Sequence, residues 1–443
     1  MDNNHKGEKY MDYNKQIKEI TDYFKNSEKK VEDFKIGVEF EHFVIDKDTM
    51  ETISYYGENG VAETLKELEK GGWEGIYEGE YILGLHKDIK TITLEPGSQF
   101  EFSMEAQKSI DGIEKEYLSF LEEIIPILEK KNQGLISTGY HPNKKINDIK
   151  LLPKKRYDFM FNYFKTKGSH AHNMMKGTGA LQVSLDYKSE EDYIKKFKVA
   201  NRLSPVLYAL FDNSFYFEGG EWDKSNLRTY IWNNCDNDRS GTVSGALEDD
   251  FNYEKYAEYI LNVPPIFIMK GSEPIPTGDK KIKEIFNPED YTIKELEHLL
   301  TMVFPDVRTK RYIEIRIMDS IPYPLSLGVV ALLKGIFYNE ESLDKMCKYL
   351  ENINVEDIKK SKLDIIENGL EGKLGDKTVL EIGRYMIKLS KEGLDEDEIK
   401  YILPMERMTN EGKNPYEITK EKSQLGKKIA LDWCLLNNFV EVR

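Results

Sequence analysis

Five glutamates lie in short segments whose residues alternate between polar and apolar, the pattern typical of a β-strand with one buried face. They are Glu39 and Glu41 in "IGVEFEHFVID", Glu95 and Glu101 in "TITLEPGSQFEFS", and Glu314 in "RYIEIRIM". Residues two apart in a strand point to the same side, so each acid is expected on the face opposite its apolar neighbours. One interpretation is an antiparallel sheet whose second face is in water. The other is a face that binds metal ions.

The composition of these faces favours the metal-binding interpretation. A face in water carries lysine as freely as glutamate, whereas the polar positions of these strands hold no lysine. Like charges on neighbouring strands repel each other, and bound divalent cations would remove that repulsion. Mg²⁺ takes oxygen ligands, commonly a few carboxylates together with the phosphate oxygens of a substrate. Arg316, which shares the face of Glu314, would suit such a phosphate.

Three other features could carry chemistry, and each has a simpler explanation. His170 and His172 form an H-x-H pair in "GSHAHNMM", and a pair of this kind in a loop more often lies at the surface or makes hydrogen bonds than binds a metal. Cys235 has no histidine near it in sequence, so it is a weak candidate nucleophile. The stretch "KGTGA" at 176–180 precedes a strand instead of a helix, which predicts a turn and not a nucleotide-binding loop.

Hydrophobic periodicity predicts the elements that would position these residues. We expect strands at 36–46, 81–85, 91–95, 99–103, 180–187, 227–232 and 311–318, and helices at 10–24, 60–73, 105–130, 189–211 and repeatedly after 325. Pro126 and Pro205 are expected to kink the helices that contain them. Ser189 and Asp192 resemble a capping box at the start of the helix that runs to residue 211.

The order of these elements predicts an α+β fold with a largely antiparallel sheet. We expect residues 1–325 to form an α+β catalytic domain. Residues 326–443 are expected to form a mostly helical C-terminal region that packs on it. The sequence contains no internal repeat and no linker rich in glycine and serine, so nothing else divides the chain.

The bulk composition narrows the class of protein. The chain has 443 residues, 40% of them hydrophobic, and a formal net charge of −16. This negative charge argues against a nucleic-acid-binding protein. The three cysteines show no C-x-x-C spacing, and the polar N-terminus and short apolar runs predict neither a signal peptide nor a membrane span. We therefore expect a cytoplasmic protein without nucleic-acid or membrane partners, as a monomer or a homodimer.

Several segments occur together in a known family. They are "IGVEFEHF", "TLEPGSQFEFS", "LPKKRYDFMFNYF", "ALQVSLDY", "LRTYIWNNCDNDRSG" and "FPDVRTKRYIEIRIMD". Their order resembles that of glutamate–cysteine ligases of the plant-like, proteobacterial type, over roughly residues 35–325. No single motif is specific to this family, but the order and spacing of the motifs together are specific to it.

This resemblance implies a glutamine-synthetase-like fold, in which a curved, largely antiparallel sheet lines a cleft and helices lie outside. It implies an ATP-dependent reaction in which the γ-carboxylate of glutamate is phosphorylated. The amine of cysteine then attacks the acyl phosphate to give γ-glutamylcysteine, the first step of glutathione synthesis. Phosphoryl transfer between two anions needs metal ions and arginine to offset the charge, and it needs no covalent nucleophile.

The resemblance also implies roles for particular residues. Gln182, Arg228 and Trp232 would bind the amino-acid substrate. Arg316 would lie near the transferred phosphate and bind ATP, and Arg316 and Glu314 would be catalytic. The ligands of the Mg²⁺ ions that bridge ATP and substrate would be Glu39, Glu41, Glu95, Glu101 and Glu314.

The chain departs from the family pattern at three places, which leaves the amine substrate open. His42 stands where a lysine is usual, "GSHAHNMM" carries two additional histidines, and "RIMDS" replaces the usual "RGAD". A related carboxylate–amine ligase with another amine is therefore an alternative. A second alternative is a phosphotransferase similar to guanidino kinases, whose product would be a phosphorylated small molecule. A non-catalytic binding protein is disfavoured, because crowded acids are a liability without a metal.

Overall fold

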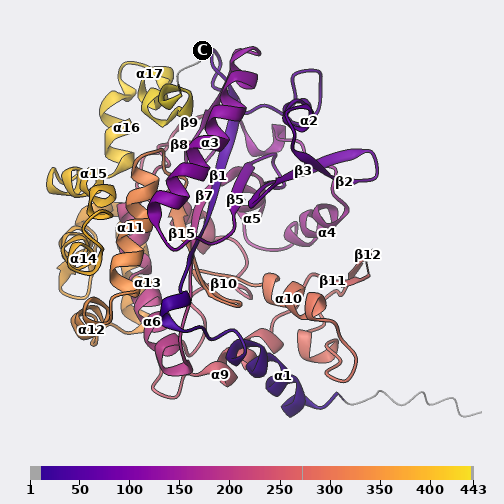
Figure 1. The fold of residues 1–443 in the computed structure, drawn as a ribbon, viewed down its shortest axis with the longest axis vertical. Helices are drawn as coiled ribbons and strands as arrows, with labels where there is room; N and C mark the ends of the chain where they lie inside the picture. The colour runs from indigo at the N-terminus through magenta and orange to yellow at the C-terminus, as the bar shows by residue number, and fades with distance from the viewer. Residues whose placement is uncertain (1–10, 272, 441–443) are drawn as a thin grey trace, which may run out of the picture.

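The computed structural model describes residues 11–271 and 273–440. Within this part of the chain, nine strands form one antiparallel sheet at the centre of the molecule (Figure 1). Their order is β14–β15–β7–β1–β5–β4–β3–β2, and β6 pairs with the second half of β1. The strands are β1 (Ile36–Asp46), β2 (Glu74–Glu78), β3 (Tyr81–Lys87), β4 (Lys90–Leu94), β5 (Phe100–Met104), β6 (Gln133–Ile136), β7 (Ala180–Leu185), β14 (Val307–Thr309) and β15 (Ile313–Asp319). The predicted α+β class with an antiparallel sheet is confirmed.

The buried face of the sheet is the face that the alternation predicts. Phe40 of β1 and Phe102 of β5 are register partners and are almost fully buried. Helix α3 (Ile110–Glu129) covers them: the Tyr117 ring stacks on Phe40 with 4.2 Å between centroids, and the Phe120 ring stacks on Phe102 with 4.3 Å. An aromatic side chain buries about 150–250 Å², so this layer supplies a large share of the apolar burial that drives folding.

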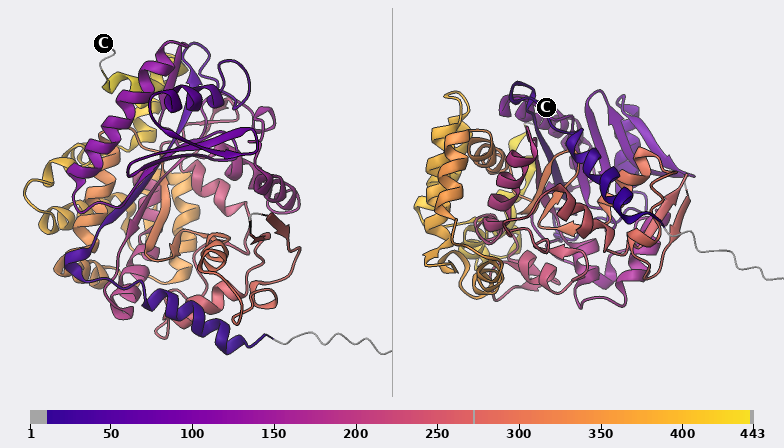
Figure 2. Two further views of the ribbon diagram at one scale, coloured as in Figure 1. Left: turned by 45° about the vertical axis from the view of Figure 1, so that its right-hand side comes forward. Right: turned by 90° about the horizontal axis from the view of Figure 1, so that it is seen from below.

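In the described part of the chain, seven helices follow β15 and gather on one side of the sheet (Figure 1 and Figure 2). They are α11 (Leu325–Phe337), α12 (Glu340–Tyr349), α13 (Val355–Asn368), α14 (Val379–Gly393), α15 (Ile399–Asn410), α16 (Pro415–Ser423) and α17 (Lys427–Leu431). Helix α11 is buried along almost its whole length, because it lies between the sheet and helices α14 and α15. The C-terminal helices therefore share a hydrophobic core with the sheet. The domain division at residue 325 stays a prediction.

Short helices lie over the other, polar face of the sheet. They are α4 (Lys155–Phe164), α5 (Ala171–Gly177) and α8 (Leu227–Asn233). Other helices are α1 (Tyr13–Lys25), α2 (Val61–Lys70), α6 (Glu190–Arg202), α7 (Ser204–Leu210), α9 (Tyr253–Leu261) and α10 (Ile293–Thr301). The remaining strands are β8 (Tyr216–Phe217) with β9 (Gly220–Glu221), β10 (Ser240–Gly241) with β13 (Phe304–Pro305), β11 (Phe267–Lys270) with β12 (Glu273–Pro276), and β16 (Lys373–Leu374) with β17 (Lys377–Thr378).

Two predicted elements differ from the structure. The helix expected at 189–211 is two helices, α6 and α7, because Pro205 lies in the first turn of the second helix, where its missing N–H costs nothing. The strand expected at 227–232 is helix α8. Leu227 and Ile231, four residues apart, are both fully buried, which is helical spacing. A run of only six residues is too short for its periodicity to separate the two structures.

Candidate active site

A pocket lies between the polar face of the sheet and helices α4, α5 and α8. It holds about 560 Å³ of empty space, part of it open to solvent. Six of the residues that line it were predicted as site residues from the sequence: Glu41, Glu95, Gln182, Arg228, Trp232 and Arg316. Residues that lie far apart in the sequence therefore meet here, because β1, β7 and β15 are neighbours in the sheet and α8 packs over them.

The strand register places the predicted acids next to one another. Glu41 of β1 faces Glu101 of β5, and Glu39 faces Gln182 of β7. The carboxylate of Glu41 accepts a hydrogen bond from the backbone N–H of Ala180 at 2.7 Å and one from Nε2 of Gln182 at 3.2 Å. The polar face is thus a row of carboxylates at the middle of the sheet.

These carboxylates repel one another in a poorly hydrated cleft. Burial and then the charge of Glu314 raise the pKa of Glu39 above its usual value. Burial and then the charge of Glu95 raise the pKa of Glu41 to about 8. Burial, Glu39 and Glu95 raise the pKa of Glu101 well above its usual range. Each shift shows a carboxylate with too little positive charge near it.

Glu314 is in a different environment from the other four acids. Its carboxylate is fully buried and touches three cations. Oε2 accepts from Nε of Arg308 at 2.7 Å and from Nη1 of Arg316 at 2.9 Å, and Oε1 lies 3.1 Å from Nζ of Lys310. Burial opposes its ionisation, but Arg308, Lys310 and Arg316 outweigh burial and hold the pKa of Glu314 well below its usual range. We call these four residues the cation cluster.

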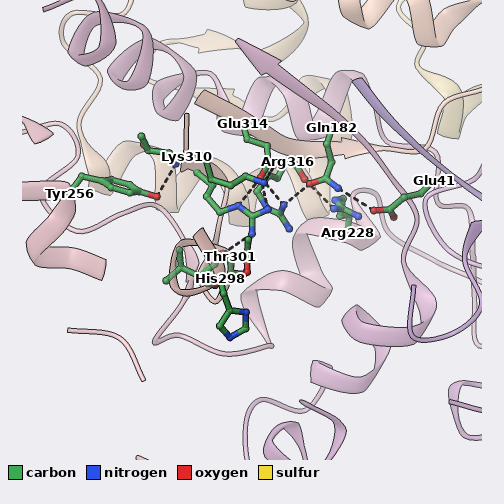
Figure 3. Close-up of polar contacts among 12 residues, drawn as sticks. Glu41, Gln182, Arg228, Tyr256, His298, Thr301, Lys310, Glu314 and Arg316 are labelled. Atoms are coloured by element: carbon green, nitrogen blue, oxygen red, sulfur yellow. Dashed lines mark hydrogen bonds and ion pairs between the residues drawn. The ribbon is translucent and has the colours of Figure 1, made fainter. Parts of the chain in front are cut away.

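A β-bulge aims Arg316 at the centre of the cleft. The register between β15 and β7 shifts after Ile315, so that an additional residue is accommodated at Arg316 and Ile317. Nη1 of Arg316 donates to Oε1 of Gln182 at 2.6 Å, and Nε2 of the same amide donates to Glu41. Gln182 therefore links the cation cluster to the row of carboxylates (Figure 3).

Helix α8 presents the predicted substrate-binding residues. Arg228 and Trp232 are four residues apart, and the guanidinium carbon of Arg228 lies 5.6 Å from the centre of the Trp232 ring. Nη2 of Arg228 donates to the backbone carbonyl of Arg316 at 3.1 Å. Among the described residues, Nε and Nη1 of Arg228 and Nε1 of Trp232 are buried and have no hydrogen-bond partner. Buried donors of this kind indicate a place for an anionic ligand.

The structure adds two pairs of cations that were not predicted. Arg308 and Lys310 lie in "FPDVRTKRYIEIRIMD", two residues apart, and belong to the cation cluster. Lys154 and Arg156 lie in "LPKKRYDF" and approach the cleft on the side of Glu95. Burial and then Arg156 lower the pKa of Lys154 to about 8. Both pairs fall within motifs that resemble the family, which is the one signal that could have found them.

The weaker candidates have structural roles. His172 stacks on Phe161 with 4.1 Å between ring centres and does not face His170 across a metal site. Burial raises the pKa of the Cys235 thiol to about 12, so it is not a thiolate nucleophile at neutral pH. His42 lies on the buried face of the sheet, 2.8 Å from the Tyr117 hydroxyl, so its departure from the family pattern does not alter the cleft.

The carboxylates fit hard cations, although they do not form a finished metal site. Among the residues that the structure describes, no three His, Cys, Asp or Glu side chains are grouped closely enough to hold a metal ion. The donors are carboxylate oxygens, which Mg²⁺ prefers, and their raised pKa values show that they lack positive charge. A divalent cation would supply that charge.

Comparison with known proteins identifies the family. A model described as Glutamate-cysteine ligase family 2 matches residues 35–428. The chain belongs to this family. The chloroplastic glutamate–cysteine ligase of Nicotiana tabacum is 32% identical over 385 residues, which cover 85% of this chain and 73% of that protein. The chloroplastic glutamate–cysteine ligase B of Oryza sativa subsp. japonica is 31% identical over 397 residues, 87% of this chain and 79% of that protein.

A solved structure of a glutamate–cysteine ligase shares the fold. The crystal structure of glutamate–cysteine ligase (gshA) from Francisella tularensis in complex with AMP has a TM-score of 0.56 and 14% identity, covering 90% of this chain and 87% of that chain. The family predicted from the motifs is therefore confirmed, together with its fold. None of the helices in the described part of the chain combines the length and hydrophobicity that a membrane span requires. The cytoplasmic location stays a prediction.

Proposed function

We propose that this member of glutamate–cysteine ligase family 2 is an ATP-dependent ligase that joins the γ-carboxylate of glutamate to the amine of cysteine. A γ-carboxylate oxygen bonds to the γ-phosphorus of ATP and ADP leaves. The amine nitrogen then bonds to the acyl carbon, phosphate leaves and the nitrogen loses a proton. The observation that carries this proposal is the pocket in which cationic donors of α8, which have no partner in the described part of the chain, face buried carboxylates of the sheet.

The glutamate substrate would lie at the α8 end of the cleft. Nε and Nη1 of Arg228 have no hydrogen-bond partner among the described residues, and one edge of its guanidinium could bind both oxygens of the substrate's α-carboxylate. Trp232 holds the guanidinium by contact with its face and adds an indole N–H. Glu41, which accepts from Gln182 and lies near the charge of Arg228, would accept from the substrate's ammonium group. The γ-carboxylate would then point along the strands toward Arg316.

The phosphates of ATP would lie beside the cation cluster. Arg308, Lys310 and Arg316 carry three positive charges, of which Glu314 offsets one. Arg316 and Lys310 are the more exposed of the three, at 15% and 17% of the side chain against 8% for Arg308. These two would neutralise charge on the transferred phosphoryl group, and Arg308 would hold Glu314.

Magnesium would be held by the carboxylates on the polar face. We propose the set predicted from the sequence: Glu39, Glu41, Glu95, Glu101 and Glu314. The metal supplies positive charge that stabilises the phosphates when it is bound. The chain's own contribution is to keep these acids together in a dry cleft, with Gln182 orienting Glu41.

A second pocket continues the same face toward the other end of β1 and would take the nucleoside of ATP. Gly37 and Glu39 line it, whereas Glu41, the next residue on this face, lines the first pocket. Ser103 and Ser184 extend it across β5 and β7, and the residues Arg311 and Tyr312 close it. Because Glu39 and Glu41 are successive residues on this face, the two pockets would form the ends of one channel with the phosphate-binding residues between them. Glutamate and ATP would enter from opposite ends.

The methionines that line the first pocket support an amine substrate with a small, polarizable side chain. Met160, Met174 and Met175 line the pocket. Thioethers are polarizable and offer no strong hydrogen-bond donor, so they suit a thiol better than a hydroxyl or a carboxylate. These methionines favour cysteine over serine. The alternative, a ligase that uses another amine, is tested by the product analysis described next.

An ADP-release assay with product analysis tests the function. Purified protein is given ATP, Mg²⁺ and glutamate, and cysteine, 2-aminobutyrate, serine and glycine are added one at a time. We expect ADP and a γ-glutamyl dipeptide with cysteine, and at least about tenfold lower kcat/KM with serine. A phosphorylated small molecule without an amide would instead support the phosphotransferase alternative. ADP release without any of these dipeptides would refute the proposed amine.

A further inference from the structure

A chain of hydrogen bonds connects the sequence's histidine pair to helix α8. The hydroxyl of Tyr230 lies 3.3 Å from Nε2 of His170, and Nδ1 of His170 lies 3.2 Å from Oδ1 of Asn173. Nδ2 of Asn173 donates to Oε1 of Glu218 at 2.9 Å and to the Tyr140 hydroxyl at 2.8 Å. The Tyr140 hydroxyl donates to the same oxygen of Glu218 at 2.7 Å. We call these five residues the histidine network.

The carboxylate at its end sets the direction of every bond in the network. Glu218 can only accept, so Asn173 must turn its amide nitrogen toward it and its oxygen toward His170. Nδ1 of His170 then carries the proton and donates. Nε2 is left to accept from the hydroxyl of Tyr230. Each group in the network therefore has a single donor and acceptor arrangement, which fixes the orientation of its side chain.

Glu218 anchors the network outside the cleft. It lies with Gly219 in the two-residue turn between β8 and β9, and both have positive φ angles, 54° and 82°, as a tight hairpin turn requires. Its carboxylate also accepts from the backbone N–H of Ile146 at 3.1 Å. The network is therefore attached to two segments that are separate from α8 in the sequence, the β8–β9 turn and the backbone at Ile146.

Helix α8 depends on such attachments. It has seven residues, and its N-cap Asn226 has a left-handed backbone and makes no side-chain cap hydrogen bond. So short a helix has little stability of its own, and its orientation is set by the contacts on its sides. One side presents Arg228 and Trp232 to the pocket. The side chain of Tyr230 projects from the other side of the helix, and its ring centroid lies 5.0 Å from that of His170.

We propose that His170 and Tyr230 are positioning residues, which hold α8 so that Arg228 and Trp232 bind the amino-acid substrate. Neither side chain lines the pocket, so each acts through the helix. The same network reaches α5 through Asn173, which precedes Met174 in the pocket wall. The inference rests on the proposed function in one respect, namely that Arg228 binds glutamate.

The two histidines of "GSHAHNMM" provide a matched pair of variants. His170→Phe keeps an aromatic ring but removes both ring nitrogens from the network. His172→Phe makes the same chemical change where the ring stacks on Phe161 and, among the described residues, only Nε2 is bonded, to the Phe161 carbonyl. We expect His170→Phe to raise the KM for glutamate about tenfold with the KM for ATP changed less than about twofold. His172→Phe should leave both unchanged.

Tyr230→Phe, which removes only a hydroxyl, should reproduce the effect of His170→Phe. Because both variants break the same bond, the double variant should be no worse than the more severe single variant. Independent, multiplicative effects in the double variant would contradict a shared role. An equal rise in the KM for ATP would also contradict it, because it would indicate general disruption of the cleft.

Amide hydrogen exchange of the whole protein gives a readout that needs no turnover. Residues 227–233 should exchange about tenfold faster in His170→Phe and Tyr230→Phe than in the wild type and His172→Phe. Unchanged exchange of α8 in His170→Phe overturns the inference, and so does faster exchange with an unchanged KM for glutamate. A wild-type protein that makes no γ-glutamyl product would refute the proposed function instead, and the exchange data would then decide whether the network holds α8.

Discussion

Nε of Arg308 donates to Oε2 of Glu314 at 2.7 Å, and the two residues face each other across strands β14 and β15. Lys310 and Arg316 add two more cations to the same carboxylate. The sequence alone predicts Glu314 as a metal ligand, whereas in the structure protein cations surround it. Its role as a ligand of Mg²⁺ stays a prediction. Its contact with three cations gives it a second role, which is to hold them together.

Glu314→Gln should lower both stability and activity. Glutamine keeps the shape but leaves three cations, one buried and two largely buried, without their anion, which we expect to cost about 3–5 kcal/mol of unfolding free energy. ADP release should fall at least about 100-fold, because Arg316 loses its position. The control is Glu297→Gln, which removes a partly exposed carboxylate 2.7 Å from the exposed Arg311 and should cost less than about 1 kcal/mol. Equal stability of both variants in denaturant titrations would show that the ion pairs of Glu314 are not important.

Arg228→Lys should raise the KM for glutamate about tenfold or more and leave the KM for ATP nearly unchanged. A guanidinium can bind both oxygens of a carboxylate, whereas an ammonium group is a point charge. Steady-state kinetics with each substrate varied in turn would measure the two constants. Arg384→Lys is the control, because Arg384 bonds backbone carbonyls among the C-terminal helices. A normal glutamate KM in Arg228→Lys would assign the substrate's carboxylate to another residue.

Lys310→Met should weaken the binding of ATP and leave that of glutamate nearly unchanged, the reverse of Arg228→Lys. Methionine keeps much of the side-chain volume and removes the charge that would face the phosphates, so the KM for ATP should rise about tenfold. The KM for glutamate should change less than about twofold, since Lys310 is absent from the residues that line the first pocket. If glutamate binding weakens and ATP binding does not, the proposed orientation of the two substrates in the channel is reversed.

The stability of the metal-free protein should depend on pH through Glu41. Its carboxyl pKa is about 8 in the fold against an ordinary 4.5, because burial and then Glu95 disfavour the charge. The unfolded chain ionises first, so stability is lost as the pH rises from about 4.5 to about 8. Glu41→Gln lacks this loss, and its Tm relative to wild type should rise steadily between pH 5 and pH 8 in EDTA. The control is Glu122→Gln at an exposed residue, whose Tm should differ from that of the wild type by the same amount at every pH. If the Tm difference of Glu41→Gln is also constant with pH, the pKa of Glu41 is not raised.

Mg²⁺ should raise the Tm of the wild-type protein more at pH 8 than at pH 6. The metal binds carboxylates in their ionised form, and at lower pH it must displace protons from them. Glu101→Gln should reduce this gain in Tm, because it removes one of the acids whose pKa is raised well above its usual range. Thermal denaturation with 0 and saturating Mg²⁺ measures the gain. ADP release that continues undiminished in excess EDTA would show that the ligase needs no divalent cation.

The alternation of residue types was enough to predict most of the sheet and its two faces. Ile313, Ile315 and Ile317 of β15 are fully buried, and Glu314 and Arg316 share the cleft face. This succeeds because side chains of a strand alternate with a period of two, whatever the strand pairs with. The strand predicted at 227–232 was wrong. Its six residues have apolar side chains both two and four positions apart, which fits a strand or a helix, and packing over the cleft favours the helix.

The residue types and their order along the chain determined the chemistry that this protein can carry: strands with acids and arginine on one face, and motifs in the order of a ligase family. The tertiary structure decided which charges meet. Arg308 joins Glu314 because β14 pairs with β15, and Tyr230 meets His170 because α8 packs on α5, across 60 positions of sequence. Local patterns depend on neighbours in the chain, whereas these contacts depend on how distant elements pack, and short polar segments carry no periodic signal of that packing.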